Sequence, residues 1–590
     1  MTSKPNPIPA PLLQQLHEHL AAIYPADQVE STYKALVSQI ESFRQAHPEL
    51  ATGTTSERFS ERDVILITYG DQIREEGKAP LQSLYEVLSS YTGDVLNGIH
   101  FLPFFPYTSD DGFSVVDYLQ INPALGTWND VEPFRQHFKL MFDFVINHIS
   151  ASSAWFQGFL NGDERYKDYF IVVDPSIDLS QVTRPRALPL LTPFETARGT
   201  EYVWTTFSAD QIDLNFANPA VLLDMTHVML EYVAHGAKLL RMDAVTYLWK
   251  TIGTNCVHLP QTHRVVQLWR TVLDAVAPQT LIVTETNVPH LENISYFGDG
   301  HNEAQMVYQF PLAPLTLYTF NKADSSVLQQ WAGTLETPSS QTTFFNFLAS
   351  HDGIGVRPTE GILSQAERDE LAERVIEHGG FVSYRNNPDG TQSPYELNIN
   401  YFDALNNPES DEPLDVQIDR FMASQAIMLS LAGVPGIYVH SLFGSRSWRE
   451  GVAQTGHNRT INRQKFERAR LEAELNDHNS LRSRVFERYR TLIQTRTSDK
   501  AFHPNGGQQI IPCDPGLFCF VRSAPDGTSQ VLCITSVAPE PRQLSLNLSS
   551  YGIASSSRML DLISNQTYQV DTDGRLNFQV EPYRVLWLKA

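Results

Sequence analysis

The sequence predicts an α/β fold: a (β/α)8 TIM barrel with inserted loop domains, followed by an antiparallel β domain. Short apolar stretches alternate with helical stretches along most of the chain, which is the pattern of parallel strands joined by crossover helices. Roughly eight such units favour a closed barrel over an open sheet. Polar residues follow the apolar stretches, at the strand ends where barrels carry their chemistry.

Residues 1–60 predict an N-terminal helical extension. Apolar side chains recur at helical spacing between a proline-rich start and a break rich in Gly, Thr and Ser. They are Leu13, Leu16, Leu20 and Ile23, then Tyr33, Leu36, Ile40 and Phe43. No residue of this segment points to a reaction.

Residues 61–500 predict the barrel itself. The apolar stretches expected as strands are residues 63–69, 98–103, 139–145, 238–243, 281–284, 341–348 and 434–439. Helical stretches lie at residues 80–91, 131–137, 219–234 and 264–276. Two interruptions, at about residues 149–215 and 356–415, are too long for ordinary loops, and loops of that size usually form substrate walls or small subdomains.

Residues 501–590 change in character. Stretches 518–522, 530–534 and 584–588 are rich in β-branched and aromatic residues. They are parted by the turn sequences Pro525-Asp526-Gly527 and Thr572-Asp573-Gly574. We therefore expect a small C-terminal β domain.

The composition excludes several classes of protein. A formal net charge of −23 over 590 residues argues against nucleic acid or an anionic membrane as a partner, because both require clustered Lys and Arg. The four cysteines, Cys256, Cys513, Cys519 and Cys533, show no metal-binding or disulfide spacing. Without a signal-peptide core or an apolar stretch of about 18 residues, we expect a cytoplasmic protein.

Three carboxylates follow predicted strands: Asp243, Glu285 and Asp352. Arg241 and Asp243 lie two residues apart in an apolar strand, so their side chains leave on the same face. A lone pair of this kind is more often a structural ion pair. Three acids at strand ends instead fit glycoside chemistry, which needs a nucleophile, an acid/base group and charge that stabilises the transition state.

The chain resembles the α-amylase superfamily, glycoside hydrolase family 13, over roughly residues 60–590. The motifs are Asp143-Phe144-Val145-Ile146-Asn147-His148, Arg241-Met242-Asp243-Ala244, Val283-Thr284-Glu285-Thr286, Ser350-His351-Asp352 and Gln211-Ile212-Asp213-Leu214-Asn215. The resemblance implies that Asp243 is the nucleophile, Glu285 the general acid/base and Asp352 the transition-state stabiliser. It also implies that His148, Arg241 and His351 line the glucose-binding subsite.

Within that family, the sucrose phosphorylase branch is the most similar. The similarity rests on residues 104–106, 109–113, 351–356 and 459–463. It implies that Asp110 and Phe113 face the glucosyl unit, that Arg459 hydrogen-bonds glucose and that Tyr247 lines the acceptor region. Arg184 and Arg186 resemble a segment whose arginine meets phosphate; a solvated surface pair is the alternative.

The acceptor side departs from the branch pattern. Thr286-Asn287 stands where Ile-His is common, and Glu396 follows Tyr395 where Gln is expected. Arg357 and the N-terminal extension are similar to the longer members, which include phosphorylases of glucosylglycerate and related glucosides. We therefore add Asn287, Tyr395 and Glu396 to Arg184 and Arg186 as acceptor or phosphate residues.

The first prediction is a retaining sucrose phosphorylase that works through a β-glucosyl-enzyme. The alternatives are phosphorylases of glucosylglycerate, sucrose 6-phosphate or glucosylglycerol, then an amylosucrase-like transglucosidase or a hydrolase, and finally a degenerate binding protein. We expect no cofactor and no metal, although Asn147 matches a calcium ligand of amylases. The resemblance implies small-molecule substrates, with inorganic phosphate as a co-substrate, and either a monomer or a homodimer.

Overall fold

A computed structural model describes residues 7–52, 58–185, 188–386 and 391–590. Its centre is a closed barrel of eight parallel strands, which confirms the predicted fold class. In chain order these are β1 (Ile65–Thr68), β3 (Gly98–Phe101), β4 (Lys139–Val145), β9 (Ala237–Asp243), β10 (Leu281–Thr284), β11 (Met306–Tyr308), β12 (Thr343–Phe347) and β16 (Val434–Tyr438). They close in the order β1-β16-β12-β11-β10-β9-β4-β3.

The prediction named seven of these strands and missed β11. That strand has three residues, which is too short to stand out as an apolar run. The others are four to seven residues long and almost entirely buried, because helices cover the outside of a parallel barrel.

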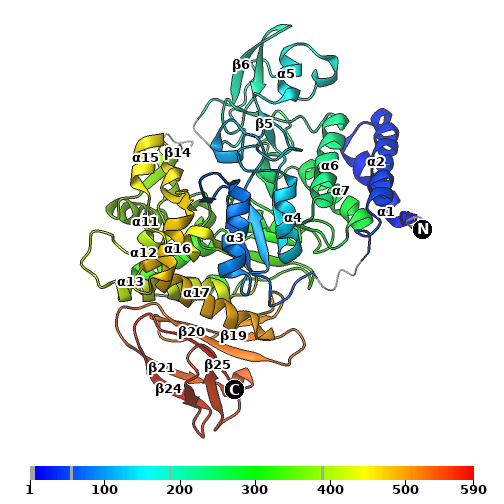
Figure 1. The fold of residues 1–590 in the computed structure, drawn as a ribbon. Helices are drawn as coiled ribbons and strands as arrows, with labels where there is room; N and C mark the ends of the chain where they lie inside the picture. The colour runs from blue at the N-terminus through cyan, green and yellow to red at the C-terminus, as the bar shows by residue number, and fades with distance from the viewer. Residues whose placement is uncertain (1–6, 53–57, 186–187, 387–390) are drawn as a thin grey trace.

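Helices pack around the barrel as expected from their apolar faces (Figure 1). They include α3 (Pro80–Thr92), α4 (Trp128–His137), α6 (Pro219–Ala234), α7 (Pro260–Val276), α9 (Leu312–Lys322), α13 (Leu414–Ser430) and α17 (Leu481–Thr497). Helix α6 shows why the chain turns helical here: Asn218 caps the Ala220 N–H at 3.0 Å, and Pro219 occupies the first turn.

Two further helices, α1 (Ala10–Ile23) and α2 (Ala26–Ala46), lie against α6 and α7 at the side of the barrel (Figure 1). Their buried residues are those of the apolar pattern, Leu16, Leu20, Leu36 and Ile40 among them. The Tyr24 hydroxyl donates to the Phe216 carbonyl at 2.9 Å, which ties the pair to the barrel. These helices form an outer layer behind β9 and its neighbours.

Inserted segments build up one end of the barrel. Between β4 and α6 lie β5 (His148–Ser150), α5 (Ala154–Leu160), β6 (Leu191–Thr196), β7 (Gly199–Trp204) and β8 (Gln211–Asp213), which form the outer lobe at the top of Figure 1. Between β12 and α13 lie β13 (Ile354–Gly355), α11 (Gln365–Glu377), β14 (Phe381–Asn386) and β15 (Gln392–Asn398). Most of the turn-rich sequence at residues 385–390 of this second insertion lies outside the described residues.

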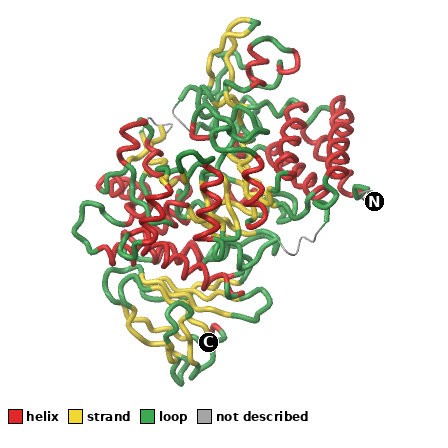
Figure 2. The backbone as a smooth tube through the Cα atoms, in the orientation of Figure 1, coloured by secondary structure: helices red, strands yellow, loops and turns green. Residues whose placement is uncertain are grey.

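The C-terminal region is antiparallel, with its own apolar core. One sheet has the order β18-β19-β20-β25-β22-β23, and β21 pairs with β24. These strands lie at the bottom of Figure 2, below the barrel and its helices. The strands are β18 (Gly507–Ile510), β19 (Leu517–Ser523), β20 (Gln530–Ser536), β21 (Arg542–Asn547), β22 (Arg558–Asp561), β23 (Thr567–Gln569), β24 (Arg575–Val580) and β25 (Val585–Lys589). The three predicted strands correspond to β19, β20 and β25.

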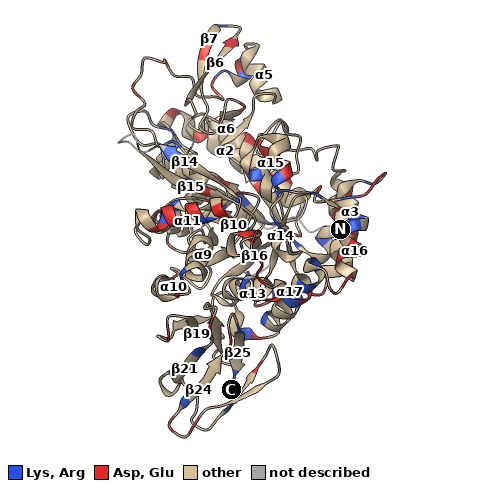
Figure 3. Cartoon of the chain, turned by 90° about the vertical axis from the view of Figure 1, so that its left-hand side faces the viewer, with Lys and Arg blue, Asp and Glu red and all other residues tan. Residues whose placement is uncertain are grey.

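On the outside of the molecule, acidic and basic residues alternate along helices such as α11 (Figure 3). Within the described ranges, every helix lacks the length or the apolar character needed to cross a membrane.

Candidate active site

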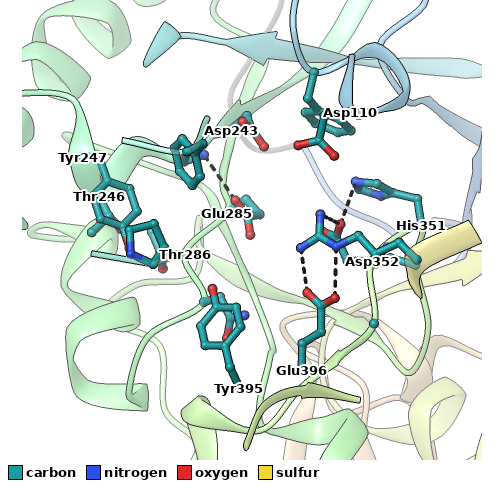
Figure 4. Close-up of a pocket in the computed structure, with 18 of the residues that line it drawn as sticks. Asp110, Asp243, Thr246, Tyr247, Glu285, Thr286, His351, Asp352, Tyr395 and Glu396 are labelled. Atoms are coloured by element: carbon teal, nitrogen blue, oxygen red, sulfur yellow. Dashed lines mark hydrogen bonds and ion pairs between the residues drawn. The ribbon is translucent and has the colours of Figure 1, made fainter. Parts of the chain in front are cut away.

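A pocket opens at the carboxyl ends of the barrel strands, where barrels of this kind bind small molecules (Figure 4). Residues from the barrel and from both insertions line it. They are Asp110, Phe113, His148, Pro185, Phe207, Gln211, Asp243, Ala244, Thr246, Tyr247, Glu285, Thr286, Asn287, Val288, Phe310, Ser350, His351, Asp352, Gly353, Tyr395, Glu396 and Arg459.

The floor of the pocket is organised around Arg241 on β9. Strand register places Asp143 of β4 beside it, and the Arg241 Nη1 donates both to Asp143 and, at 2.9 Å, to Asp243. The Arg241 Nε lies 3.1 Å from the Tyr308 hydroxyl. Because the guanidinium is fully buried, these partners are what make its charge tolerable.

A second layer holds Asp143 itself. His100 of β3 donates from Nε2 to the Asp143 carboxylate at 2.7 Å, and both side chains are buried. Sequence reasoning assigned no role to Asp143, His100 or Tyr308. A single polar residue inside a predicted apolar strand was the available signal for Asp143 and His100, whereas Tyr308 ends β11, which was not predicted. The strand register that joins the three residues cannot be read from the sequence.

Glu285 follows β10 and lies near the same guanidinium, with Oε2 at 3.8 Å from Arg241 Nη2. The Ala244 N–H donates to the Glu285 carboxylate at 3.2 Å. Ala244 has a left-handed backbone conformation (φ 50°), which residues other than glycine rarely adopt. Burial raises the pKa of Glu285 and of Asp243. The Arg241 charge opposes both shifts, and the Glu285 carboxylate raises the pKa of Asp243 further.

Asp352 has the opposite electrostatic surroundings. Arg459 Nη1 lies 2.5 Å from its Oδ1, and Arg463 Nη2 lies 3.6 Å away. Burial alone raises the pKa of Asp352, but the charge of Arg459 and further positive groups outweigh it and lower the pKa to about 2. Asp352 is therefore ionised across the physiological range.

The predicted glucose-side residues come together around these acids. The Phe113 ring stacks on His351 with centroids 4.8 Å apart, and His148 Nε2 donates to the Phe113 carbonyl at 2.9 Å. Burial lowers the pKa of His148 to about 4 and of His351 to about 3, so both rings are neutral near pH 7. Asp110 accepts a hydrogen bond from Gln211 at 3.3 Å.

The predicted acceptor-side residues do not all lie together: some line the pocket, one pairs with Arg459 and one is exposed. Asn287 and Tyr395 line the pocket, with Tyr395 opposite Asp110 (Figure 4). Glu396 instead accepts from Arg459 at 3.0 and 2.7 Å, and so joins the network around Asp352. Arg184 is exposed, although its neighbour Pro185 lines the pocket, and Arg186 lies outside the described residues.

Behind the pocket, the buried Lys250 ammonium lies between Asp213 and Asn147, two polar residues of the motifs that resemble family 13. Lys250 Nζ lies 2.6 Å from Asp213 Oδ2 and donates to Asn147 Oδ1 at 2.7 Å, with its side chain only 4% exposed. In the described part of the chain, no group of three or more His, Cys, Asp and Glu is arranged to hold a metal.

Comparison with known proteins places this geometry in context. Residues 93–370 match the model of the alpha amylase catalytic domain. The chain is 48% identical over 98% of both chains to the glucosylglycerate phosphorylase of Spirochaeta thermophila. The sucrose phosphorylase of Streptococcus mutans is 26% identical over 79% of this chain and 93% of its own. Sucrose 6F-phosphate phosphorylase from Thermoanaerobacter thermosaccharolyticum has the same fold (TM-score 0.71, 24% identity, 88% of this chain and 98% of that one).

Proposed function

Because the chain belongs to the α-amylase family of glycoside hydrolases, family 13, as a phosphorylase-type glycosyltransferase, we propose that it is a glucosylglycerate phosphorylase. The observation that carries the proposal is 48% identity along nearly the whole length of a relative with that name. The predicted first choice, sucrose phosphorylase, has weaker support, since such a relative is only 26% identical. The reaction is glucosylglycerate plus phosphate giving α-glucose 1-phosphate plus glycerate, with retention.

In the first step, an Asp243 carboxylate oxygen attacks the anomeric carbon of the glucosyl unit. The bond to the glycerate oxygen breaks as the bond to Asp243 forms, giving a β-glucosyl-enzyme. The 2.9 Å hydrogen bond from Arg241 orients this carboxylate and favours its ionised form against the effect of burial.

Glu285 supplies the proton that the leaving oxygen needs. Two buried acids around one guanidinium together hold a proton near neutral pH. That proton belongs on Glu285, because Asp243 accepts the shorter hydrogen bond from Arg241 while Glu285 lies 3.8 Å from it. In the second step phosphate attacks the anomeric carbon from the vacated face and returns a proton to Glu285, releasing Asp243.

Asp352 stabilises the positive charge that develops on the sugar ring. It remains an anion because Arg459 holds its pKa near 2, so it is charged whenever the reaction runs. The neutral His148 and His351 rings and the Phe113 face close the glucosyl subsite without adding charge.

The test is to incubate the enzyme with α-glucose 1-phosphate and one acceptor at a time, and to measure the phosphate released. Glycerate is expected to react with the highest kcat/KM, ahead of fructose, fructose 6-phosphate and glycerol. A preference for fructose would return the assignment to sucrose phosphorylase. Equal glucose release with and without phosphate in the forward direction would indicate a hydrolase instead.

A further inference from the structure

One guanidinium, which acts on the pocket-lining Tyr247 and Tyr395, has no role in the steps above. Arg357 begins the short helix η6 (Arg357–Thr359), directly after β13. The preceding residue, Val356, donates its N–H to the Tyr395 carbonyl at 3.1 Å. Gly355 packs so tightly on Asn287 that an added Cβ would lie 2.8 Å from the Asn287 Oδ1. Arg357 therefore directly follows two residues, Gly355 and Val356, that contact Asn287 and Tyr395 of the acceptor side.

Arg357 differs from the other arginines around the pocket in its charge balance. Arg241 pairs with Asp143 and Asp243, Arg459 with Asp352 and Glu396, and Arg463 with Asp111 and Asp352. In the described part of the chain, no carboxylate lies within ion-pair distance of Arg357, and its Nε is buried without a hydrogen-bond partner. A half-buried cation with unused donors is costly unless a ligand completes it.

The positive charge of Arg357 acts on the pKa of two tyrosines that line the pocket, Tyr247 and Tyr395. Burial raises the pKa of Tyr247, and Arg357 opposes that shift through its charge and a side-chain hydrogen bond. Burial and the Glu396 charge likewise raise the pKa of Tyr395 to about 12, again opposed by Arg459 and Arg357. Arg357 is thus electrostatically coupled to both aromatic walls of the acceptor side.

Asn287 provides a second group without a partner. Its Oδ1 is buried, lines the same side of the pocket and accepts no hydrogen bond from any described residue. An acceptor without a partner and a guanidinium with a free Nε donor, both on the acceptor side, are complementary to a ligand that carries a hydroxyl next to an oxyanion.

We propose that Arg357 binds the oxyanion of the group in the acceptor subsite, with Asn287 accepting a hydrogen bond from that group's hydroxyl. The inference rests on the proposed function, because glycerate and phosphate enter or leave on the same face of the glucosyl unit. Glycerate carries a carboxylate within a few bonds of either hydroxyl, and phosphate carries its charge one atom from the attacking oxygen. The remaining pocket side chains include five carboxylates, so either anion needs a local cation.

The test compares Arg357→Gln with the wild type, using α-glucosyl fluoride as the donor. Fluoride leaves no oxyanion in the acceptor subsite, so the product ratio reports only how the glucosyl-enzyme chooses its acceptor. Glycerate, glycerol, phosphate and water compete in the same mixture. Loss of a hydrogen-bonded ion pair predicts a fall of roughly 10- to 100-fold for an anionic acceptor relative to glycerol.

The pattern of the loss identifies the source of the oxyanion. If only the glycerate product falls relative to the glycerol product, Arg357 binds the glycerate carboxylate. If only the phosphate product falls, Arg357 binds phosphate. If both products fall, Arg357 binds whichever anion occupies the acceptor subsite. An unchanged ratio of both anions to glycerol and water overturns the proposal. So does an equal loss for all four acceptors, since that marks a structural role.

Two controls separate charge from folding and from the proposed function. Arg385→Gln makes the same change in β14 of the same insertion, where the arginine is paired with Glu360 at 2.6 Å, and should leave the acceptor ratios unchanged. Thermal unfolding of each variant checks its fold. If the wild type prefers fructose to glycerate, the proposed function fails while the phosphate arm still tests Arg357.

Discussion

The glucosyl side and the acceptor side of the pocket are built differently. On the glucosyl side, Arg241 and Arg459 each contact at least two carboxylates, which come from strands β4 and β9, the loop after β12, and β15 of the second insertion. On the acceptor side, Asn287 follows β10 in a loop and Arg357 begins η6 after β13, and no carboxylate of the described residues lies within ion-pair distance of Arg357. The buried cations of the glucosyl side are therefore paired with carboxylates before any ligand arrives, whereas the cation of the acceptor side is left for the ligand to pair.

This difference shows how one scaffold serves several leaving groups. Preorganised charge lowers the barrier to glucosyl transfer because it needs no rearrangement during the reaction. Selectivity among acceptors instead depends on which ligand satisfies the unpaired groups, since leaving a buried polar group unmet costs about 1–3 kcal/mol. Variants should therefore separate into those that affect every acceptor and those that affect one class.

The largest expected effect comes from Glu285→Gln, on the glucosyl side. Loss of the acid should lower turnover of glucosylglycerate by roughly 10²- to 10⁴-fold, and much less for α-glucosyl fluoride, whose leaving group needs little protonation. The pH profile adds a second readout. Burial raises the pKa of Glu285, so the wild type loses activity as rising pH removes this proton. With fluoride as leaving group, the variant should lose that alkaline limb and keep the acid limb, which reports Asp243.

Steady-state kinetics from about pH 4 to 10 with both donors would measure these changes, and circular dichroism would check the fold. An alkaline limb that survives in the variant would assign it to another group. Equal losses for the two donors would contradict the acid role.

The two sides also differ in how far the sequence predicts them. Asp243, Glu285 and Asp352 were predicted to lie together because each follows an apolar strand in a distinctive motif, and strand ends converge in a barrel. The contact between Asp143 and Arg241 depends on the register of two strands about a hundred residues apart, which local pattern does not encode. The contacts of Glu396 and Arg357 depend on loop conformation. Glu396 was predicted for the acceptor side, but the structure joins it to Arg459.

The contact of Glu396 with Arg459 makes Glu396→Gln the next test of the difference between the two sides of the pocket. The substitution keeps the side-chain shape but removes the charge that holds Arg459 against Asp352. Weakening a charged hydrogen-bond pair predicts a rise in KM for α-glucose 1-phosphate of about tenfold, with the same factor for glycerate and glycerol as acceptors. A change confined to one acceptor would return Glu396 to the acceptor side.

The smallest effect on turnover is expected at Lys250, behind the glucosyl side. Its ammonium compensates Asp213 and Asn147, so a chelator should leave wild-type activity unchanged. Lys250→Ala leaves a buried carboxylate without its cation, which predicts a stability loss of about 3–5 kcal/mol in denaturant titrations. Turnover per folded molecule should change by less than about threefold, because Lys250 does not line the pocket among the described residues.

The matched control is Lys238→Ala, an exposed lysine near the start of β9. Millimolar Ca²⁺ should raise the unfolding temperature of the Lys250 variant and leave both the wild type and the control unchanged, because only the variant has vacated oxygen ligands. Chelator-sensitive wild-type activity would show that a metal contributes where the ammonium lies. The glucosyl side would then also need a bound ion to complete its charges, as the acceptor side needs a ligand, and the difference between the two sides would not hold at Lys250.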